Sequence, residues 1–274
     1  MKLIIILVLI MLGLAAAVLT GKRAVELSEV KGDESKPAAP GPVAPVLVEL
    51  FTSEGCSSCP PADELLARLE QTQPVAGAEI IALSEHVDYW NRLGWADPYS
   101  SAEFSERQNS YARAFDTDDI YTPQMIVDGR VQFVGSNRDR ARQAIAEASR
   151  AAKARVEISL RGATVDSANL AISVSDLQSA WTGDSAEVLL AITESGLHSS
   201  VSRGENAGRS LHHTAVVRTL SNLGSIDSQS KSFSAEPGVR IERKWKRENL
   251  KAVVFVQERA SRRVLGAAQI SLMK

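Results

Sequence analysis

The chain has 274 residues, of which 44% are hydrophobic and 23% are charged, a composition typical of globular proteins. This length is enough to bury a core and fits one large domain or two smaller ones. The formal net charge is −2, so no overall basic field points to nucleic acid or to an anionic membrane surface as the main partner.

The chain begins with an apolar segment. Lys2 precedes an unbroken uncharged run over residues 3–19, and Ala15–Ala17 offer a small-residue cleavage site. The run is longer than a usual signal core and lies at the lower limit for a membrane span. Residues 1–21 are therefore predicted to be a cleaved signal peptide or an uncleaved membrane tether. Both place the rest of the chain outside the cytoplasm, in the periplasm or another extracytoplasmic compartment, where disulfides persist.

Residues 22–45 follow as a linker. Four of the ten prolines fall between Pro37 and Pro45, mixed with Ala and Gly. This composition favours an extended, semi-rigid tether.

Residues 46–154 show alternating strand and helix patterns, which predict an α/β domain. The expected elements are a strand at 46–51, a helix at 61–73, a strand at 79–84, a helix over about 101–115, two strands around the Asp128-Gly129 turn, and a helix capped by Asn137 that runs to about residue 154.

Residues 155–274 show short alternating, β-rich runs separated by turn residues. Alternation at period two with repeated turns is typical of antiparallel sheets. The sequence therefore predicts a second, all-β domain with a sandwich architecture.

The chain's two cysteines, Cys56 and Cys59, lie between the first predicted strand and helix. As a structural staple, a disulfide closing a four-residue loop would stabilise the fold by only about 2 kcal/mol. A closed zinc site needs four ligands, and three of the four histidines lie in the second predicted domain, so no metal ligands are assigned. A soft ion such as Cu(I) needs fewer ligands and stays an alternative.

A C-x-x-C pair between a strand and a helix is typical of a redox centre. The helix start favours a thiolate at Cys56, and Cys59 is placed to resolve a mixed disulfide. Pro60 and Pro61 lack N–H groups, so the regular helix is expected to begin near Pro61, which weakens the helix effect on Cys56. Cys56 is expected to be exposed and Cys59 to be buried.

The motifs "FTSEGCSSCPPAD" and "YTPQMIVDG" resemble those of the thioredoxin superfamily. The resemblance implies a thioredoxin-like fold for residues 46–154, with a cis Thr122–Pro123 bond packed against the cysteines and both residues shaping a substrate groove. With "HVDYWNRLGW" and "ENAGRSLHHTAVVR", the chain from about residue 46 to 274 resembles an exported bacterial family of unknown function, which brings no established reaction.

The sequence departs from ordinary thioredoxins around the cysteines. Gly55, not Trp, precedes Cys56, and Leu50 occupies the position of the buried acid. Glu49 is adjacent, but strand alternation turns it to the other face. A proton acceptor for Cys59 is therefore not assigned.

Two further segments carry polar side chains. If the chain after the second strand is extended, His86 and Asp88 share a face, and the carboxylate would orient the imidazole as a base or ligand. In the alternative, the neighbouring aromatic residues pack over the sheet and His86 is simply hydrogen-bonded. The other segment holds Glu205, Asn206, Arg209, His212 and His213. Its adjacent histidines face opposite ways on a strand, so we expect an Arg–carboxylate brace or a contact between the domains.

The sequence therefore predicts an exported thiol–disulfide oxidoreductase. Cys56 attacks, Cys59 resolves, no cofactor is needed, and the partners are protein thiols or disulfides or another redox protein. Two alternatives stay open. The same thiols bind or deliver Cu(I) or another soft metal, or the β domain is the working part of a binding protein whose disulfide is inert.

Overall fold

The structure is a computed structural model that describes residues 43–273 except 178–179, 182–184, 228 and 231. The expected signal or anchor at residues 1–21 and the linker up to residue 42 lie outside the described residues. Within the described part, no helix is long and apolar enough to cross a membrane.

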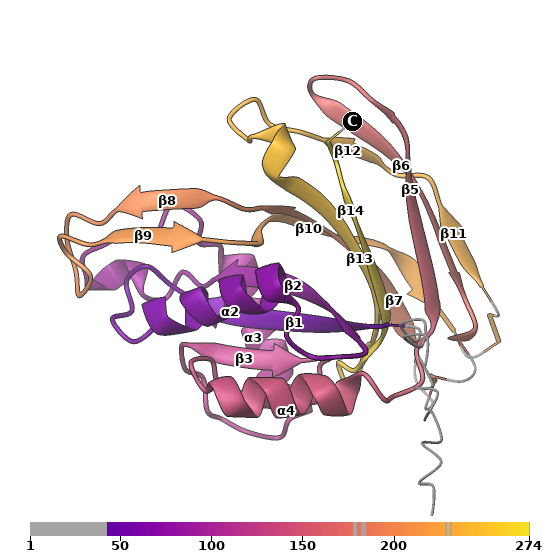
Figure 1. The fold of residues 1–274 in the computed structure, drawn as a ribbon, viewed down its shortest axis with the longest axis horizontal. Coiled ribbons are helices and arrows are strands. Elements are labelled where there is room, and N and C mark those ends of the chain that lie inside the picture. Colours follow the sequence, from indigo (N-terminus) through magenta and orange to yellow (C-terminus); the bar gives the residue numbers. More distant parts are fainter. Residues whose placement is uncertain (1–42, 178–179, 182–184, 228, 231, 274) are drawn as a thin grey trace, which may run out of the picture. The chain divides into compact units, whose positions relative to one another are not determined.

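Strands and helices alternate in the first half of the chain (Figure 1). They are β1 (Ala44–Thr52), α2 (Pro60–Thr72), β2 (Ala78–His86), a 3₁₀ turn (Asn91–Leu93), α3 (Ala102–Ala114), β3 (Gln124–Val127), β4 (Val131–Val134) and α4 (Arg138–Ala148). Strands dominate the second half. They are β5 (Arg155–Ala163), β6 (Ser167–Ser175), β7 (Ala186–Glu194), β8 (Leu197–Ser200), β9 (Ser210–His213), β10 (Val216–Ile226), β11 (Phe233–Ala235), β12 (Gly238–Arg240), β13 (Leu250–Glu258) and β14 (Val264–Ser271).

The two halves share one mixed, eight-stranded sheet with the order β14-β13-β7-β10-β2-β1-β3-β4. The halves meet where β10 pairs in parallel with β2, through Val216 opposite Ser84 and a 2.8 Å hydrogen bond from Ser84 N to Ala215 O. The expectation of a thioredoxin-like α/β domain followed by a separate all-β sandwich is therefore wrong. Residues 87–123 form the 3₁₀ turn, α3 and loops, and they add no strand to the sheet. The edge of β2 that faces away from β1 therefore pairs with β10, which comes from the second half of the chain.

Alternating side chains of β1 supply both faces of the sheet. On one face, Val46 and Val48 pack with Leu66 of α2 and Ile145 of α4. On the other face, Leu47 joins a buried cluster with residues of both halves: Ile81, Leu83, Phe104, Leu189, Ala191, Val217, Val253, Phe255, Val264 and Ala267. This shared core binds the first half of the chain to the second.

Most local predictions are confirmed to within two residues, including the Asn137 cap, whose side chain accepts from Arg140 N. Ser101 caps α3 in the same way, by accepting from Glu103 N. The helix expected to reach about Ala154 ends at Ala148 instead. Ala154 N donates to Leu265 O at 2.7 Å, so the chain leaves α4 early to reach β14.

The remaining strands form two smaller sheets. One contains β5, β6, β11 and β12, and the other is the β8–β9 hairpin. The hairpin lies beside α2 in Figure 1, and its tip, residues 201–209, reaches toward the start of that helix. This position brings residues near 205 to the cysteine turn.

Candidate functional site

Cys56 and Cys59 form a disulfide at the beginning of α2, with their Cα atoms 5.5 Å apart. Cys59 is the N-cap of the helix, and Pro60 and Pro61 occupy the first two helical positions. The intervening Ser57 is exposed, but both cysteines are fully buried. The expectation of an exposed Cys56 is therefore wrong for the disulfide form, because the turn packs its sulfur inward.

Thr122 lies against the disulfide. Its carbonyl oxygen is 3.9 Å from Cys56 Sγ, and its hydroxyl accepts a 2.8 Å hydrogen bond from Trp90 Nε1. The Thr122–Pro123 peptide bond is cis, as the resemblance implied, and Pro123 O accepts from Gly135 N at 2.9 Å. The structure thus brings Thr122 to the cysteines over 66 residues of sequence.

Two imidazole–carboxylate pairs are buried behind the cysteine turn. His86 Nδ1 lies 2.7 Å from Asp97 Oδ2, and His213 Nε2 lies 2.9 Å from Glu54 Oε1. The two imidazole rings meet edge-on, with centroids 4.8 Å apart, and Tyr99 packs against both. One pair comes from the first half of the chain, and the other joins the two halves.

Further hydrogen bonds tie these pairs to the turn. Glu54 N donates to Asp97 Oδ2 at 2.8 Å, and Trp95 Nε1 donates to Glu54 Oε2 at 2.7 Å. Burial alone would raise the pKa of Asp97, but the attraction of His86 and the hydrogen bonds to the carboxylate hold it below its usual value. Asp97 is therefore ionised.

Asp63 is a buried acid one helical turn beyond Cys59. Positions i and i+4 share a helix face, and Asp63 N donates to Cys59 O at 3.1 Å. Burial raises the pKa of Asp63 to about 7, against the opposing influence of His213. Three buried polar atoms here have no hydrogen-bond partner among the described residues: Asp63 Oδ1, His86 Nε2 and His213 Nδ1. These buried groups can hold and exchange protons within the cluster.

The tip of the β8–β9 hairpin closes over the turn from the second half of the chain. Asn206 Nδ2 donates to Glu54 O at 2.8 Å and to Cys56 O at 2.9 Å, and Glu205 Oε2 accepts from Ser57 N at 3.0 Å. The predicted contact between the halves is thus present at this segment. Its form differs from an Arg–carboxylate brace, because Glu205 binds a backbone N–H.

Sequence reasoning gave His86 the wrong partner. Asp88 accepts a hydrogen bond from Ser105, while Asp97, eleven residues beyond His86, approaches the imidazole. The hydrogen bond that the alternative expected for His86 is present, with Asp97 as the partner, and the aromatic ring packed against the imidazole is that of Tyr99. Asp63 and Asp97 were missed, and the only local signal was the position of Asp63 one turn beyond Cys59.

Glu49 faces away from the cysteines, as strand alternation predicted. It pairs with Arg107 and Tyr111 in a buried cluster on the opposite face, where Arg107 also reaches Glu85 at 3.2 Å and Gln257 at 3.0 Å. Burial raises the pKa of Glu85 to about 8, although Arg107 opposes this. The Arg107 guanidinium thus binds the carboxyl groups of Glu49 and Glu85, and its contacts link α3 to β1, β2 and β13.

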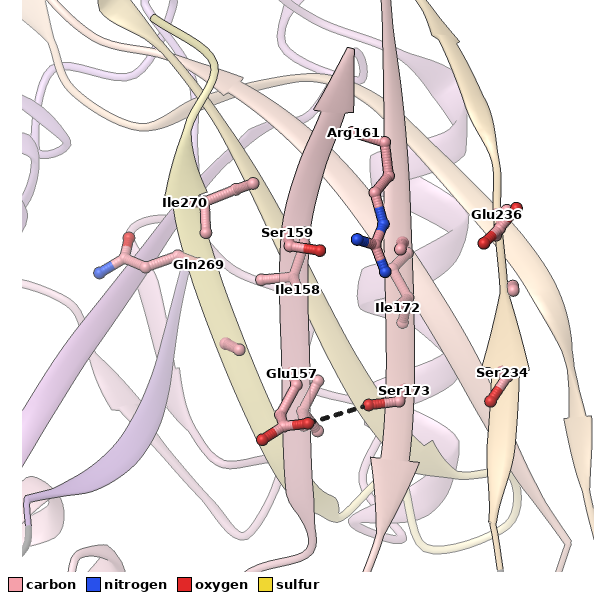
Figure 2. Close-up of a pocket in the computed structure, with 14 residues that line it drawn as sticks. Glu157, Ile158, Ser159, Arg161, Ile172, Ser173, Ser234, Glu236, Gln269 and Ile270 are labelled. Atoms are coloured by element: carbon pink, nitrogen blue, oxygen red, sulfur yellow. Dashed lines mark hydrogen bonds between the residues drawn. The ribbon is translucent and has the colours of Figure 1, made fainter. Parts of the chain in front are cut away.

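The described residues contain no group of three or more His, Cys, Asp or Glu side chains arranged to hold a metal ion. An open pocket of 690 Å³ lies elsewhere, over β5, β6, β11 and β14 (Figure 2). Its charged lining residues are Glu157, Arg161 and Glu236, and Glu157 accepts from Ser173 at 3.2 Å. The pocket shares no residue with the cysteine site.

Comparisons with known proteins give a family and a fold. A family model described as "Protein of unknown function (DUF1223)" matches residues 47–257. The comparison with curated proteins gives no match. The crystal structure of protein AGR_C_4864 from Agrobacterium tumefaciens is 28% identical, and the match covers 85% of this chain and 96% of that one at a TM-score of 0.60. HBP35 of Porphyromonas gingivalis is 15% identical over 85% of this chain and 76% of that one, at a TM-score of 0.59, and this likeness concerns the fold alone.

Proposed function

This chain belongs to the DUF1223 family, which brings no known reaction with it, and we propose from the site that it is an exported thiol–disulfide oxidoreductase. The observation that carries the proposal is the Cys56–Cys59 disulfide at the start of α2, with Thr122 O against Cys56 and a buried acid one turn beyond Cys59. A staple of this loop length would add only about 2 kcal/mol to a fold that already has a large core.

In the reducing direction, the Cys56 thiolate attacks one sulfur of a partner disulfide and expels the other as a thiolate. Ser58 Oγ, 3.3 Å from Cys56 Sγ, is placed to donate a hydrogen bond to the attacking thiolate. The product is a mixed disulfide between Cys56 and the partner.

Cys59 then loses its proton and attacks Cys56 Sγ, which reforms the Cys56–Cys59 bond and expels the second partner thiolate. The partner disulfide gains two electrons and the protein dithiol loses two. Asp63, with a pKa near neutrality, is the group suited to accept the Cys59 proton. In the oxidising direction, the same steps run in reverse with a partner dithiol as the electron donor.

The place of action belongs to the same proposal. The apolar run over residues 3–19 directs the chain out of the cytoplasm, where the Cys56–Cys59 bond persists. The partners are then exported proteins that carry thiols or disulfides.

The test combines metal analysis with trapping in the full-length protein. After its metal content is measured, Cys59→Ser protein is mixed with oxidised glutathione, and the covalent adduct is followed by mass spectrometry. We expect a stable adduct on Cys59→Ser and much less on Cys56→Ser, because Cys56 is the attacking thiol of the proposed mechanism and has the Ser58 hydroxyl 3.3 Å from its sulfur, whereas Cys59 only resolves the adduct. Equal adduct on both variants, or none on either, would refute the exchange mechanism. Tight, stoichiometric Cu(I) binding without exchange would favour the metal-binding alternative.

A further inference from the structure

The tip of the β8–β9 hairpin places a carboxylate beside the cysteine turn. Glu205 Oε2 accepts a 3.0 Å hydrogen bond from Ser57 N, and this nitrogen is bonded to the carbonyl carbon of Cys56. Covalent geometry therefore keeps the carboxylate within about 8 Å of Cys56 Sγ. That separation is inside the Debye length of about 10 Å at 0.1 M salt, so the two groups interact electrostatically.

The hairpin tip holds Glu205 in place. Asn206, which is fully buried, donates to Cys56 O and Glu54 O. Gly204 adopts a φ of +74° and packs near Trp95, where an added Cβ would lie 3.2 Å from Trp95 Cβ. Backbone bonds inside the loop, from Gly208 N to Val201 O and from Ala207 N to Gly204 O, fix its shape.

Glu205 carries its charge at neutral pH. The hydrogen bonds from Ser57 lower the pKa of this exposed carboxyl group. The first turn of α2 does little to offset the charge, because Pro60 and Pro61 have no N–H groups and the N–H groups of Ala62 and Asp63 are bonded to Cys59 O. A thiolate at Cys56 would thus form beside a carboxylate, and the first turn of α2 would stabilise its charge only weakly.

We propose that Glu205 biases the cysteine pair toward its disulfide state, because its carboxylate opposes a negative charge on Cys56. This tuning role rests on the proposed function, but the effect on the Cys56 thiol can be measured without any exchange reaction. A residue about 150 positions further along the chain would thereby shift the reduction potential of the Cys56–Cys59 pair.

The first measurement uses the Cys59→Ser protein, in which Cys56 is the single thiol, and follows the ultraviolet absorbance of the thiolate against pH. We expect Glu205→Gln, which keeps a hydrogen-bond acceptor but removes the charge, to lower the pKa of Cys56 by roughly 0.5–1. Glu236→Gln is the matched control, since Glu236 is exposed between β11 and β12 and its loss should leave this pKa unchanged.

Salt separates a charge effect from a structural one. At about 1 M salt the Debye length is about 3 Å, so the difference between Glu205→Gln and the parent should largely disappear. The remaining ionisable groups packed behind the turn are the same in both proteins and cancel in the comparison: Glu54, Asp63, His86, Asp97 and His213.

The second measurement is the equilibrium of the two-cysteine protein with glutathione at about pH 9, where the thiolate is well populated. Glu205→Gln should shift the equilibrium roughly fivefold toward the dithiol, which is about 20 mV toward a more oxidising couple at 29.6 mV per tenfold. The shift should vanish near pH 5, where Cys56 is a neutral thiol in both proteins.

The outcomes separate the two proposals. An unchanged or higher Cys56 pKa in Glu205→Gln, or a shift that persists at high salt, overturns the role of Glu205. If the pKa falls as expected but the two-cysteine protein does not exchange with glutathione, the oxidoreductase proposal fails while the effect of Glu205 on Cys56 stands.

Discussion

Replacing Asp63 by Asn should make the protein more stable at neutral and alkaline pH. Burial raises the pKa of Asp63 from 3.8 to about 7, so above that pH the folded protein must hold a carboxylate that the unfolded chain keeps in water. A difference of about 3 in pKa, at about 1.4 kcal/mol each, corresponds to up to about 4 kcal/mol. Asn has nearly the shape of the protonated acid and avoids this cost.

The sign follows from the raised pKa in the folded state. Below about pH 4, Asp63 is protonated in both states and the variant should match the wild type. The advantage of Asp63→Asn should then grow by about 1.4 kcal/mol per pH unit and level off above about pH 7. Urea unfolding of the oxidised proteins at several pH values measures it, with equal m-values as the check on two-state behaviour. A stability difference independent of pH, or a less stable variant at pH 8, would show that His213 or another neighbour stabilises the carboxylate and would refute the reasoning.

Three other outcomes are expected. Asp63→Asn should slow resolution by Cys59, so that more mixed disulfide accumulates on the otherwise intact protein than on wild type; equal amounts in a quenched mass-spectrometric time course would remove Asp63 from the mechanism. Arg107→Met should lower the free energy of unfolding by about 3–5 kcal/mol, because it leaves the buried Glu49 carboxylate without its opposite charge, whereas the exposed Arg113→Met should leave denaturant midpoints unchanged. Residues 43–154 produced alone should fail to fold cooperatively by circular dichroism, and a sharp thermal transition would contradict the shared core described above.

Local patterns predicted the elements because local chemistry determines them. The helix predicted at 61–73, the Asn137 cap and the Asp128-Gly129 turn each depend on interactions over a few residues, and the structure confirms them. The end of α4 was missed because a contact with Leu265, over a hundred residues away, draws the chain out of the helix at Ala148.

The sheet and the polar site depend on contacts that periodicity does not encode. The sequence of β2 predicts a buried strand, but it does not indicate that β10 is the strand that pairs with it. His86 was assigned to Asp88 by strand alternation, whereas the loop after β2 returns Asp97 to the imidazole. His213 and Glu205 were recognised as polar candidates. Their contacts with Glu54 and Ser57 could be seen only in the folded structure.

The contacts that complete the cysteine turn span unusually long stretches of chain. Ser57 meets Glu205 across 148 residues, and Glu54 meets His213 across 159. Because these partners lie so far along the chain, the contacts around the turn are complete only once the hairpin is present and docked. A chain still being made holds both thiols long before it holds the carboxylate and imidazole that surround them. If Glu205 opposes a thiolate at Cys56 as proposed, the reactivity of the pair in an unfinished chain differs from its reactivity in the finished protein.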